Sequence, residues 1–189
     1  VVAAQKGDWR ALEMLMRHVY PEVLRFLGRL SGDAELARDL TQETLWTVSR
    51  ELCRLKQSDA FMPWLYRIAR NTFYSAHRKH TLRRTLSLDR LVARLGNDTT
   101  FPDPDGPIEQ CDNRDAIDQV LAELTPPARE VIYLRHVAGY SGPEIAAIVG
   151  ISHSAAKQRV NRAERAFRDR HNDVHAPTDL KETEKEMGA

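Results

Sequence analysis

Apolar residues recur at intervals of three and four along most of the first 80 positions, which is the period of an α-helix. The first stripe consists of Trp9, Leu12, Leu15, Met16, Val19 and Tyr20. Pro21 predicts the first turn of a new helix, because proline fits where no backbone N–H is needed. Two more helices are predicted, over residues 33–56 and from Phe61 to about Lys79. Their inward side chains are predicted to be Leu36, Leu40, Val48, Leu52 and Leu55, and then Phe61, Leu65, Ile68 and Thr72.

The same period returns in residues 111–170. A helix carrying Ile117, Val120, Leu121 and Leu124 is stopped by Pro126-Pro127, and another runs from about Ala128 to Val137, where Gly139 ends it. Two segments follow, Ser141 to Val149 and Ser152 to about Arg168, with Gly150 between them.

Turn-forming residues separate the two helical parts: Gly96, Asn97, Pro102, Pro104, Gly106 and Pro107. The pattern predicts an all-α protein of two small helical domains, residues 1–80 and 111–170, joined by a flexible linker over 81–110. Residues 171–189 are polar and rich in acids, and we expect them to be disordered because they offer little apolar surface to bury.

A short helix, a glycine-containing turn and a longer helix over residues 139–168 form the pattern of a helix-turn-helix. On the second helix, the apolar positions Ala156, Val160, Ala163 and Phe167 are predicted to pack inward. The opposite face carries Ser154, Lys157, Gln158, Asn161, Arg162 and Arg165. Amides and cations in this arrangement can read base edges and hold phosphates in a major groove. The alternative is a solvated basic helix.

Residues 67–90 hold seven Lys and Arg against one acid, Asp89. One face of the helix combines Arg67, Arg70, Asn71, Tyr74 and Arg78. Cations beside an aromatic ring and an amide can hold phosphates and stack on an unpaired base. The alternative is that Trp64, Tyr66 and Tyr74 are packing residues.

The helix predicted over residues 33–56 has the opposite character on one of its faces. Asp39, Gln42, Glu43 and Trp46 share this face, opposite the leucine stripe. An outward tryptophan beside carboxylates favours a contact with another protein. The alternative is a solvated acidic face with Trp46 partly tucked in.

Composition narrows the function classes. The 189 residues carry a net charge of +1, so any nucleic-acid binding depends on the separation of charge along the chain. No apolar run is long enough for a membrane span, and no signal peptide is evident, so we expect a cytoplasmic protein without membrane insertion. Cys53 and Cys111 are expected to be free thiols. No catalytic set, metal-ligand spacing or cofactor loop is found, so no enzyme activity or cofactor is expected.

Four motifs in order resemble the sigma-70 family, and within it the extracytoplasmic-function (ECF) group. Asp39-Leu40-Thr41-Gln42-Glu43-Thr44 resembles a helix of region 2, and Phe61-Met62-Pro63-Trp64-Leu65-Tyr66-Arg67-Ile68-Ala69-Arg70-Asn71 resembles a further segment of that region in the ECF group. Leu124-Thr125-Pro126-Pro127-Ala128-Arg129-Glu130-Val131 resembles the opening of region 4, and Gly139 to Ala163 resembles its helix-turn-helix. The resemblance covers nearly all of residues 5–168.

The resemblance implies a factor that binds core RNA polymerase, through the β′ clamp helices and the β flap, and that directs it to promoter DNA. It assigns the polymerase contact to Asp39, Gln42, Glu43 and Trp46. It assigns binding of the −10 element to Ser58, Asp59, Ala60, Phe61, Arg67, Arg70, Asn71, Tyr74 and Arg78. It assigns binding of the −35 element to Ser154, Lys157, Gln158, Asn161, Arg162 and Arg165. It also implies a monomer when free and an anti-sigma factor as a regulator.

Two other functions remain open from the residues alone. A conventional DNA-binding regulator would use residues 111–170 to read DNA and residues 1–80 to sense or dimerise, and it would bind duplex tightly without polymerase. A helical adaptor without a DNA role would leave the basic faces unexplained. The start of the recognition helix, Ser154-Ala155-Ala156, departs from the family, so the −35 preference cannot be copied. The acidic tail could compete with DNA for this helix.

Overall fold

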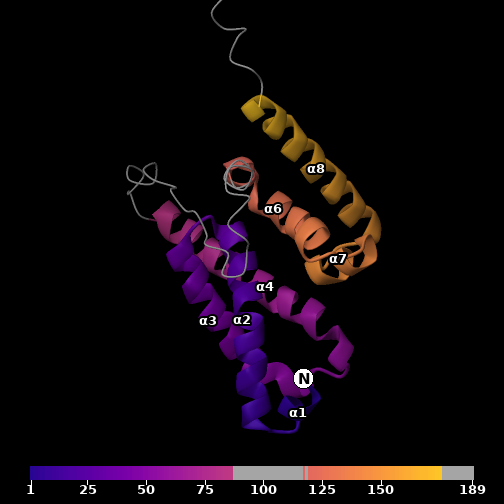
Figure 1. Ribbon diagram of the computed structural model, residues 1–189. Coiled ribbons are helices and arrows are strands. Elements are labelled where there is room, and N and C mark those ends of the chain that lie inside the picture. The colour runs from indigo at the N-terminus through magenta and orange to yellow at the C-terminus, as the bar shows by residue number, and fades with distance from the viewer. Residues whose placement is uncertain (87–116, 118, 176–189) are drawn as a thin grey trace, which may run out of the picture.

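The computed structural model describes residues 1–86, 117 and 119–175, and every regular element in these ranges is a helix (Figure 1). The expected all-α architecture is confirmed for this part of the chain. Two helical groups are present, one made by the N-terminal half and one by the C-terminal half. Most of the linker predicted over residues 81–110 and of the tail predicted over 171–189 lies outside the described residues.

The N-terminal helical group contains α1 (Val2–Gln5), α2 (Trp9–Ser31), α3 (Ala34–Glu51) and α4 (Phe61–Leu86). Two short 3-10 turns, η1 (Leu52–Arg54) and η2 (Ser58–Ala60), join α3 to α4. Asp8 and Asp33 cap α2 and α3, since each carboxylate accepts hydrogen bonds from two backbone N–H groups of the first turn. These caps fix where the two long helices begin.

The C-terminal helical group contains α6 (Pro126–Ile132), the π-helical turn η4 (Tyr133–Val137), α7 (Gly142–Val149) and α8 (His153–His175). Residues 119–123 are also helical. Pro126 and Pro127 occupy the first turn of α6, where their missing N–H groups cost nothing. Gly139 follows η4 with a positive φ of 75°, which ends the helix as the sequence predicts.

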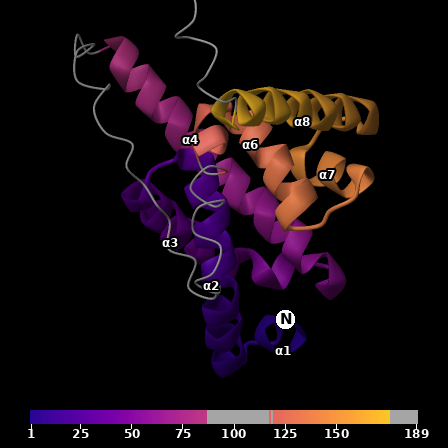
Figure 2. The same ribbon diagram turned by 45° about the horizontal axis from the view of Figure 1, so that its top comes forward.

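The two groups pack against each other around a continuous apolar core. Helix α6 contacts α2, and α7 contacts α4. Figures 1 and 2 both place α8 on the outside, beyond α6 and α7. Phe26, Tyr66 and Tyr133 meet at this junction, with the Phe26 and Tyr133 ring centroids 5.2 Å apart. The junction is therefore built like a protein interior, with rings in edge and tilted contacts.

Several local expectations are wrong. Pro21 lies inside the continuous helix α2 and does not start a new one. Because a proline inside a helix removes one hydrogen bond but not the packing of its neighbours, buried Val19 and Val23 hold the helix together on either side. Trp9 is 65% exposed and Leu36 is 39% exposed, so neither belongs to the core.

The inward faces of the remaining helices are largely confirmed. Phe61, Leu65, Ile68 and Thr72 are all buried on α4. Two helices end later than predicted, since α4 continues to Leu86 and α8 to His175, whereas the helix predicted over 33–56 ends early, at Glu51, and gives way to the turn η1. The last turns of α8 are largely polar, so apolar periodicity gives little signal for them.

Candidate nucleic-acid interface

Helices α7 and α8 form the helix-turn-helix that the sequence predicts. Gly150 ends α7 in the left-handed conformation, with φ at 75°, and the Ser152 hydroxyl accepts a 3.2 Å hydrogen bond from the N–H of Ala155 at the start of α8. At the other end of α7, the Glu144 carboxylate accepts a 2.8 Å hydrogen bond from the Ser141 N–H. The Ser141 hydroxyl donates to the same carboxylate, and the two bonds from Ser141 lower the pKa of Glu144, the hydroxyl bond the more strongly. Capping and one glycine thus fix where α7 ends and where α8 begins.

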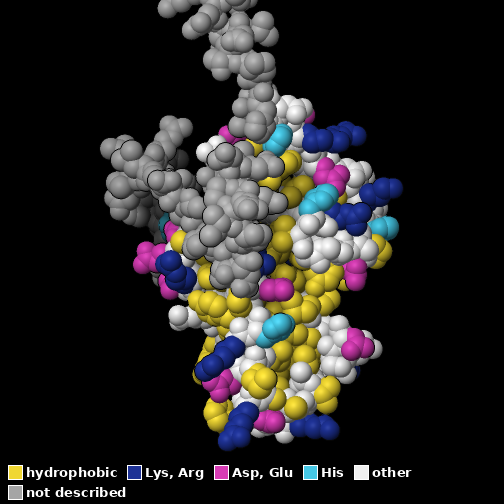
Figure 3. Space-filling view, viewed as in Figure 1, with side chains coloured by type: hydrophobic (Ala, Val, Ile, Leu, Met, Phe, Trp, Pro, Cys, Tyr) yellow, Lys and Arg dark blue, Asp and Glu magenta, His cyan; other side chains and the backbone are white. Residues whose placement is uncertain are grey.

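Each predicted position on the outer face of α8 is exposed, and within the helix Arg162 Nε donates a 3.3 Å hydrogen bond to the carbonyl of Gln158. The six exposed residues are Ser154, Lys157, Gln158, Asn161, Arg162 and Arg165. On the opposite face Ala156, Val160 and Ala163 are buried and Phe167 is half-buried. Lys and Arg side chains project from the surface over α8 (Figure 3). A basic, amide-bearing helix face that is open along its length can enter a major groove.

The predicted −10 face of α4 divides into two parts. Arg67, Asn71 and Arg78 are exposed, whereas Arg70 and Tyr74 are half-buried against the C-terminal helical group. The Arg70 guanidinium lies over the Tyr74 ring, 4.8 Å from its centroid, and Arg70 Nη1 donates a 3.3 Å hydrogen bond to Asn71 Oδ1. Only part of this face is therefore open in the structure.

The turn before α4 is less exposed than a base-binding loop would suggest. Asp59 is exposed, Ser58 and Ala60 are half-buried, and Phe61 is buried with 4% exposure. The Phe61 ring packs near Trp64, at a centroid distance of 6.1 Å. In this structure Phe61 anchors the turn in the core, and only its neighbours present polar groups outward.

Glu130 of α6 is a buried charged residue beside the predicted −10 face, and the helical pattern did not single it out. Its side chain is fully buried, and Oε1 lies 2.6 Å from Arg70 Nε in an ion pair whose angle does not suit a hydrogen bond. Its other oxygen, Oε2, accepts a 3.0 Å hydrogen bond from the Tyr74 hydroxyl. Burial raises the pKa of Glu130, and Arg70, Tyr74 and Arg159 oppose that rise. Glu130 stands four residues before the apolar Leu134, so helical spacing places it on the same, buried face. A buried carboxylate needs a partner, and this position was the signal that the sequence offered.

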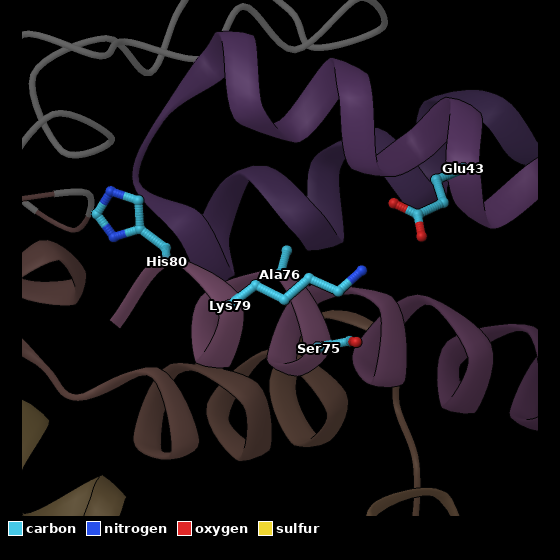
Figure 4. Close-up of a pocket in the computed structure, with 5 residues that line it drawn as sticks. All are labelled: Glu43, Ser75, Ala76, Lys79 and His80. Atoms are coloured by element: carbon cyan, nitrogen blue, oxygen red, sulfur yellow. The ribbon is translucent and has the colours of Figure 1, made fainter. Parts of the chain in front are cut away.

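The acidic face of α3 is exposed as predicted. Asp39, Gln42 and Glu43 are exposed, and Trp46 is 65% exposed. A cavity of about 230 Å³ separates this face from α4 and is lined by Glu43, Ser75, Ala76, Lys79 and His80 (Figure 4). Residues of opposite charge from two helices thus border one groove, with Glu43 on α3 and Lys79 on α4.

A second cavity, of about 280 Å³, lies where α2, α4 and η4 meet. The Tyr66 hydroxyl donates a 3.1 Å hydrogen bond to Glu22 Oε2 at its wall, and burial raises the pKa of Tyr66. Burial likewise raises the pKa of Tyr140, on the same wall, to about 12. These phenols stay protonated at neutral pH, so they can donate hydrogen bonds at the junction.

Metal and membrane sites were also sought in the described part of the chain. No group of three His, Cys, Asp or Glu side chains there is placed to hold a metal ion. None of the helices described combines the length and the apolar character that a bilayer crossing requires. Cys53 is a free, exposed thiol, and Cys111 lies outside the described residues.

Comparison with known families matches both helical groups. Residues 15–83 match the family described as Sigma-70 region 2, and residues 114–167 match the family described as Sigma-70, region 4. The RNA polymerase sigma factor CarQ of Myxococcus xanthus is 34% identical over 166 residues, covering 86% of this chain and 90% of the relative. The ECF RNA polymerase sigma factor SigF of Caulobacter vibrioides is 32% identical, covering 77% of this chain and 76% of that protein.

Solved structures share the arrangement of the helices. The sigma factor RpoE of Bartonella quintana, solved with the anti-sigma factor NepR, has a TM-score of 0.69 at 26% identity and covers 85% of this chain and 96% of its own. CnrH, solved with the cytosolic domain of CnrY, has a TM-score of 0.62 at 23% identity, covers 89% of this chain and 92% of its own, and shows the same fold. With both regions present in order, and with relatives matched over most of their length, the chain belongs to the ECF group of the sigma-70 family of RNA polymerase sigma factors.

Proposed function

We propose that this sigma factor binds polymerase through α3 and reads a promoter at two places, through α4 and α8. The observation that carries the proposal is the separation of charge on exposed faces: acids with Trp46 on α3, and cations with amides on α4 and α8. A conventional regulator needs no region 2, so the matches to both sigma-70 regions favour the promoter-specificity factor. We assign these two regions to two binding domains, residues 1–80 and residues 111–170.

The polymerase contact is assigned to Asp39, Gln42, Glu43 and Trp46. Exposing an indole to water forfeits apolar burial, which favours a protein partner that covers Trp46. The carboxylates of Asp39 and Glu43, in the turns of α3 before Trp46, would orient a partner surface of opposite charge, which on the polymerase we assign to the β′ clamp helices. The C-terminal helical group would meet the β flap.

The −10 element is assigned to the basic face of α4 and the turn before it. Arg67 and Arg78 are exposed and can hold the backbone of a single strand, while the Asn71 amide can pair with the edge of an unstacked base. Stacking of a captured base on an aromatic side chain contributes about 1–3 kcal/mol, which favours the melted strand without a catalytic residue.

The −35 element is assigned to α8. Gln158 and Asn161 have the amide geometry that pairs with adenine, and Lys157, Arg162 and Arg165 can neutralise phosphates or read guanine. Ser154 lies next to the N-terminus of the helix, where side chains approach base edges.

Regulation by an anti-sigma factor is inferred from one relative. The Bartonella quintana sigma factor was solved in complex with such a protein, and its fold matches this chain over most of its length. We infer that a similar partner binds this chain, that the free protein is a monomer, and that it acts in the cytoplasm, where polymerase and chromosome are found.

The test is transcription in vitro with core RNA polymerase and a fragment library of the source genome. We expect discrete start sites that require the intact protein and that are lost with Asp39→Ala/Glu43→Ala. The control Glu13→Ala/Asp169→Ala removes the same charge from α2 and α8 and should keep the start sites. Tight duplex binding without polymerase, combined with an absence of transcripts, would contradict the proposal.

A further inference from the structure

The C-terminal helical group covers part of the surface that the proposed function assigns to single-stranded DNA. Arg70 and Tyr74 belong to the −10 face of α4, yet both contact Glu130 of α6. The side chain of Arg70 is 21% exposed and that of Glu130 is fully buried. Arg67, Asn71 and Arg78 on the same face remain exposed, so the contact is confined to one edge of it.

The chemistry of this contact matches the chemistry of a DNA backbone contact. An arginine guanidinium binds carboxylate and phosphate oxygens alike, and a tyrosine hydroxyl donates to either anion. Glu130 offers one oxygen to Arg70 at 2.6 Å and the other to Tyr74 at 3.0 Å. The carboxylate therefore takes the place that one phosphate group of a single strand would take.

We propose that Glu130 is an internal competitor for the DNA backbone, which holds the two helical groups together and blocks Arg70 and Tyr74 until DNA or polymerase separates the groups. The proposal rests on the proposed function for its DNA-binding role. Burial of an anion without a partner is costly, so Glu130 favours the packed arrangement as long as Arg70 faces it. Separation exposes both groups to water, where phosphate can replace the carboxylate.

Glu130 has another cationic neighbour, which shapes the design of the test. Arg159 of α8 lies close enough to lower the pKa of Glu130, so a variant at Glu130 also alters the C-terminal helical group itself. A second variant on the other side of the contact is needed. Tyr74→Phe removes the hydroxyl that donates to Glu130 while it keeps the ring for stacking.

The experiment measures the separation of the two groups by pulsed electron paramagnetic resonance in the free, full-length protein. Spin labels are placed on exposed Cys53 and on Asn172→Cys, with Cys111→Ser to leave two thiols. We expect the unsubstituted pair to give one narrow distance distribution. Glu130→Gln should raise the ratio of open to closed molecules about tenfold, which corresponds to about 1.4 kcal/mol, and Tyr74→Phe should raise it about threefold.

A matched control and a binding measurement complete the test. Glu164→Gln removes a carboxylate that pairs with His136 at 3.0 Å inside the C-terminal helical group, so it should leave the distances unchanged. The affinity of the free protein for a fluorescein-labelled single strand of dT12 should rise up to about tenfold in Glu130→Gln. The reason is that a larger share of the molecules is open and able to bind DNA.

Unchanged distances in a Glu130→Gln protein that keeps its helical circular dichroism would overturn the proposal. If Glu130→Gln loses helicity, the distances in Tyr74→Phe are the test instead. Unchanged distances in Tyr74→Phe would also overturn the proposal. The distance measurement needs neither polymerase nor promoter, so an opened chain that starts no transcripts would contradict the proposed function but not the role of Glu130 in holding the two groups together.

Discussion

Arg129 of α6 donates a hydrogen bond of 3.2 Å from Nη1 to the carbonyl oxygen of Leu30, near the end of α2. Its Nε and Nη2 donate to the carbonyls of Leu124 and Ala122, at 2.9 and 2.6 Å. The last carbonyls of a helix have no partner within it and carry its negative dipole, so a cation there is favourable. One side chain therefore satisfies acceptors of both helical groups.

Replacement of Arg129 by lysine should destabilise the protein. A single ammonium on a flexible stem does not reach three carbonyls at once, and those left without donors cost about 1–3 kcal/mol of unfolding free energy. Urea titration followed by circular dichroism measures the loss. Arg165→Lys, on the exposed face of α8, should stay within about 0.5 kcal/mol. Equal stability of both variants would show that the Leu30 contact contributes nothing.

Two tryptophans with the same exposure allow a matched test of the polymerase face. Trp46 and Trp9 are each 65% exposed, but only Trp46 lies among the carboxylates of α3. We expect Trp46→Ala to weaken binding to core polymerase at least tenfold, the cost of one interface residue worth more than about 1.4 kcal/mol. Trp9→Ala should bind normally. Titration of labelled protein with core enzyme measures both, and equal losses would remove the assignment to α3.

Two neighbouring residues of α8 should separate phosphate contact from base reading. Lys157→Ala should weaken promoter binding for every −35 sequence and reduce the salt slope by about one ion. Asn161→Ala should cost about 1–3 kcal/mol at one base pair and relax the preference there. Fluorescence anisotropy of holoenzyme on promoter duplexes over a salt series gives both quantities. Arg10→Ala, exposed on α2, is the control for charge alone, and a loss there as large as that of Lys157→Ala would contradict a specific phosphate contact.

The Glu144 cap of α7 should give the stability of the protein a defined pH dependence. Hydrogen bonds from Ser141 lower the pKa of Glu144 in the folded state, so the charged form is favoured by folding. Its contribution is complete above the usual pKa of glutamate, about 4.3, and is lost as pH falls through the lowered folded value. The difference in unfolding free energy between the native chain and Glu144→Gln should therefore be present at pH 7 and vanish in acid. A difference that grows on acidification would contradict this sign.

Gly150 should be sensitive to backbone strain rather than to crowding. Its φ is 75°, and a Cβ added there would meet no atom within 4 Å. Gly150→Ala should thus cost about 1–2 kcal/mol, the penalty of the left-handed conformation for an L-residue. Gly150→Asn should cost less, because asparagine tolerates that conformation. Thermal unfolding compares the two variants, and an unaffected Ala variant would mean that the turn relaxes to another shape.

Local periodicity was sufficient to predict most of the helices and their faces. The inward positions of α4 and α8 are buried as predicted except Phe167, which is half-buried, and the outward positions of α8 and Trp46 are exposed. These features depend on residues three and four positions apart, so a single segment contains the whole signal. The helix-turn-helix could be predicted for the same reason, because Gly150 and Ser152 fix the turn locally.

Contacts between distant segments could not be read from such patterns. Tyr74 and Glu130 are 56 positions apart, and Leu30 and Arg129 are 99 apart, so no local spacing relates them. Trp9 shows the opposite failure, since its stripe predicted burial but its side chain is left exposed by the part of the chain that the structure describes.

By itself, the amino-acid sequence determined the all-α class, the helix-turn-helix, the separation of acidic and basic faces, and the family. Only the tertiary structure decided that the two helical groups share one core and that Arg70 and Tyr74 face Glu130. The physical reason is that helix formation and amphipathicity are short-range properties of the chain. Burial of a charge, in contrast, is decided by whichever distant segment excludes water from it and supplies its partner.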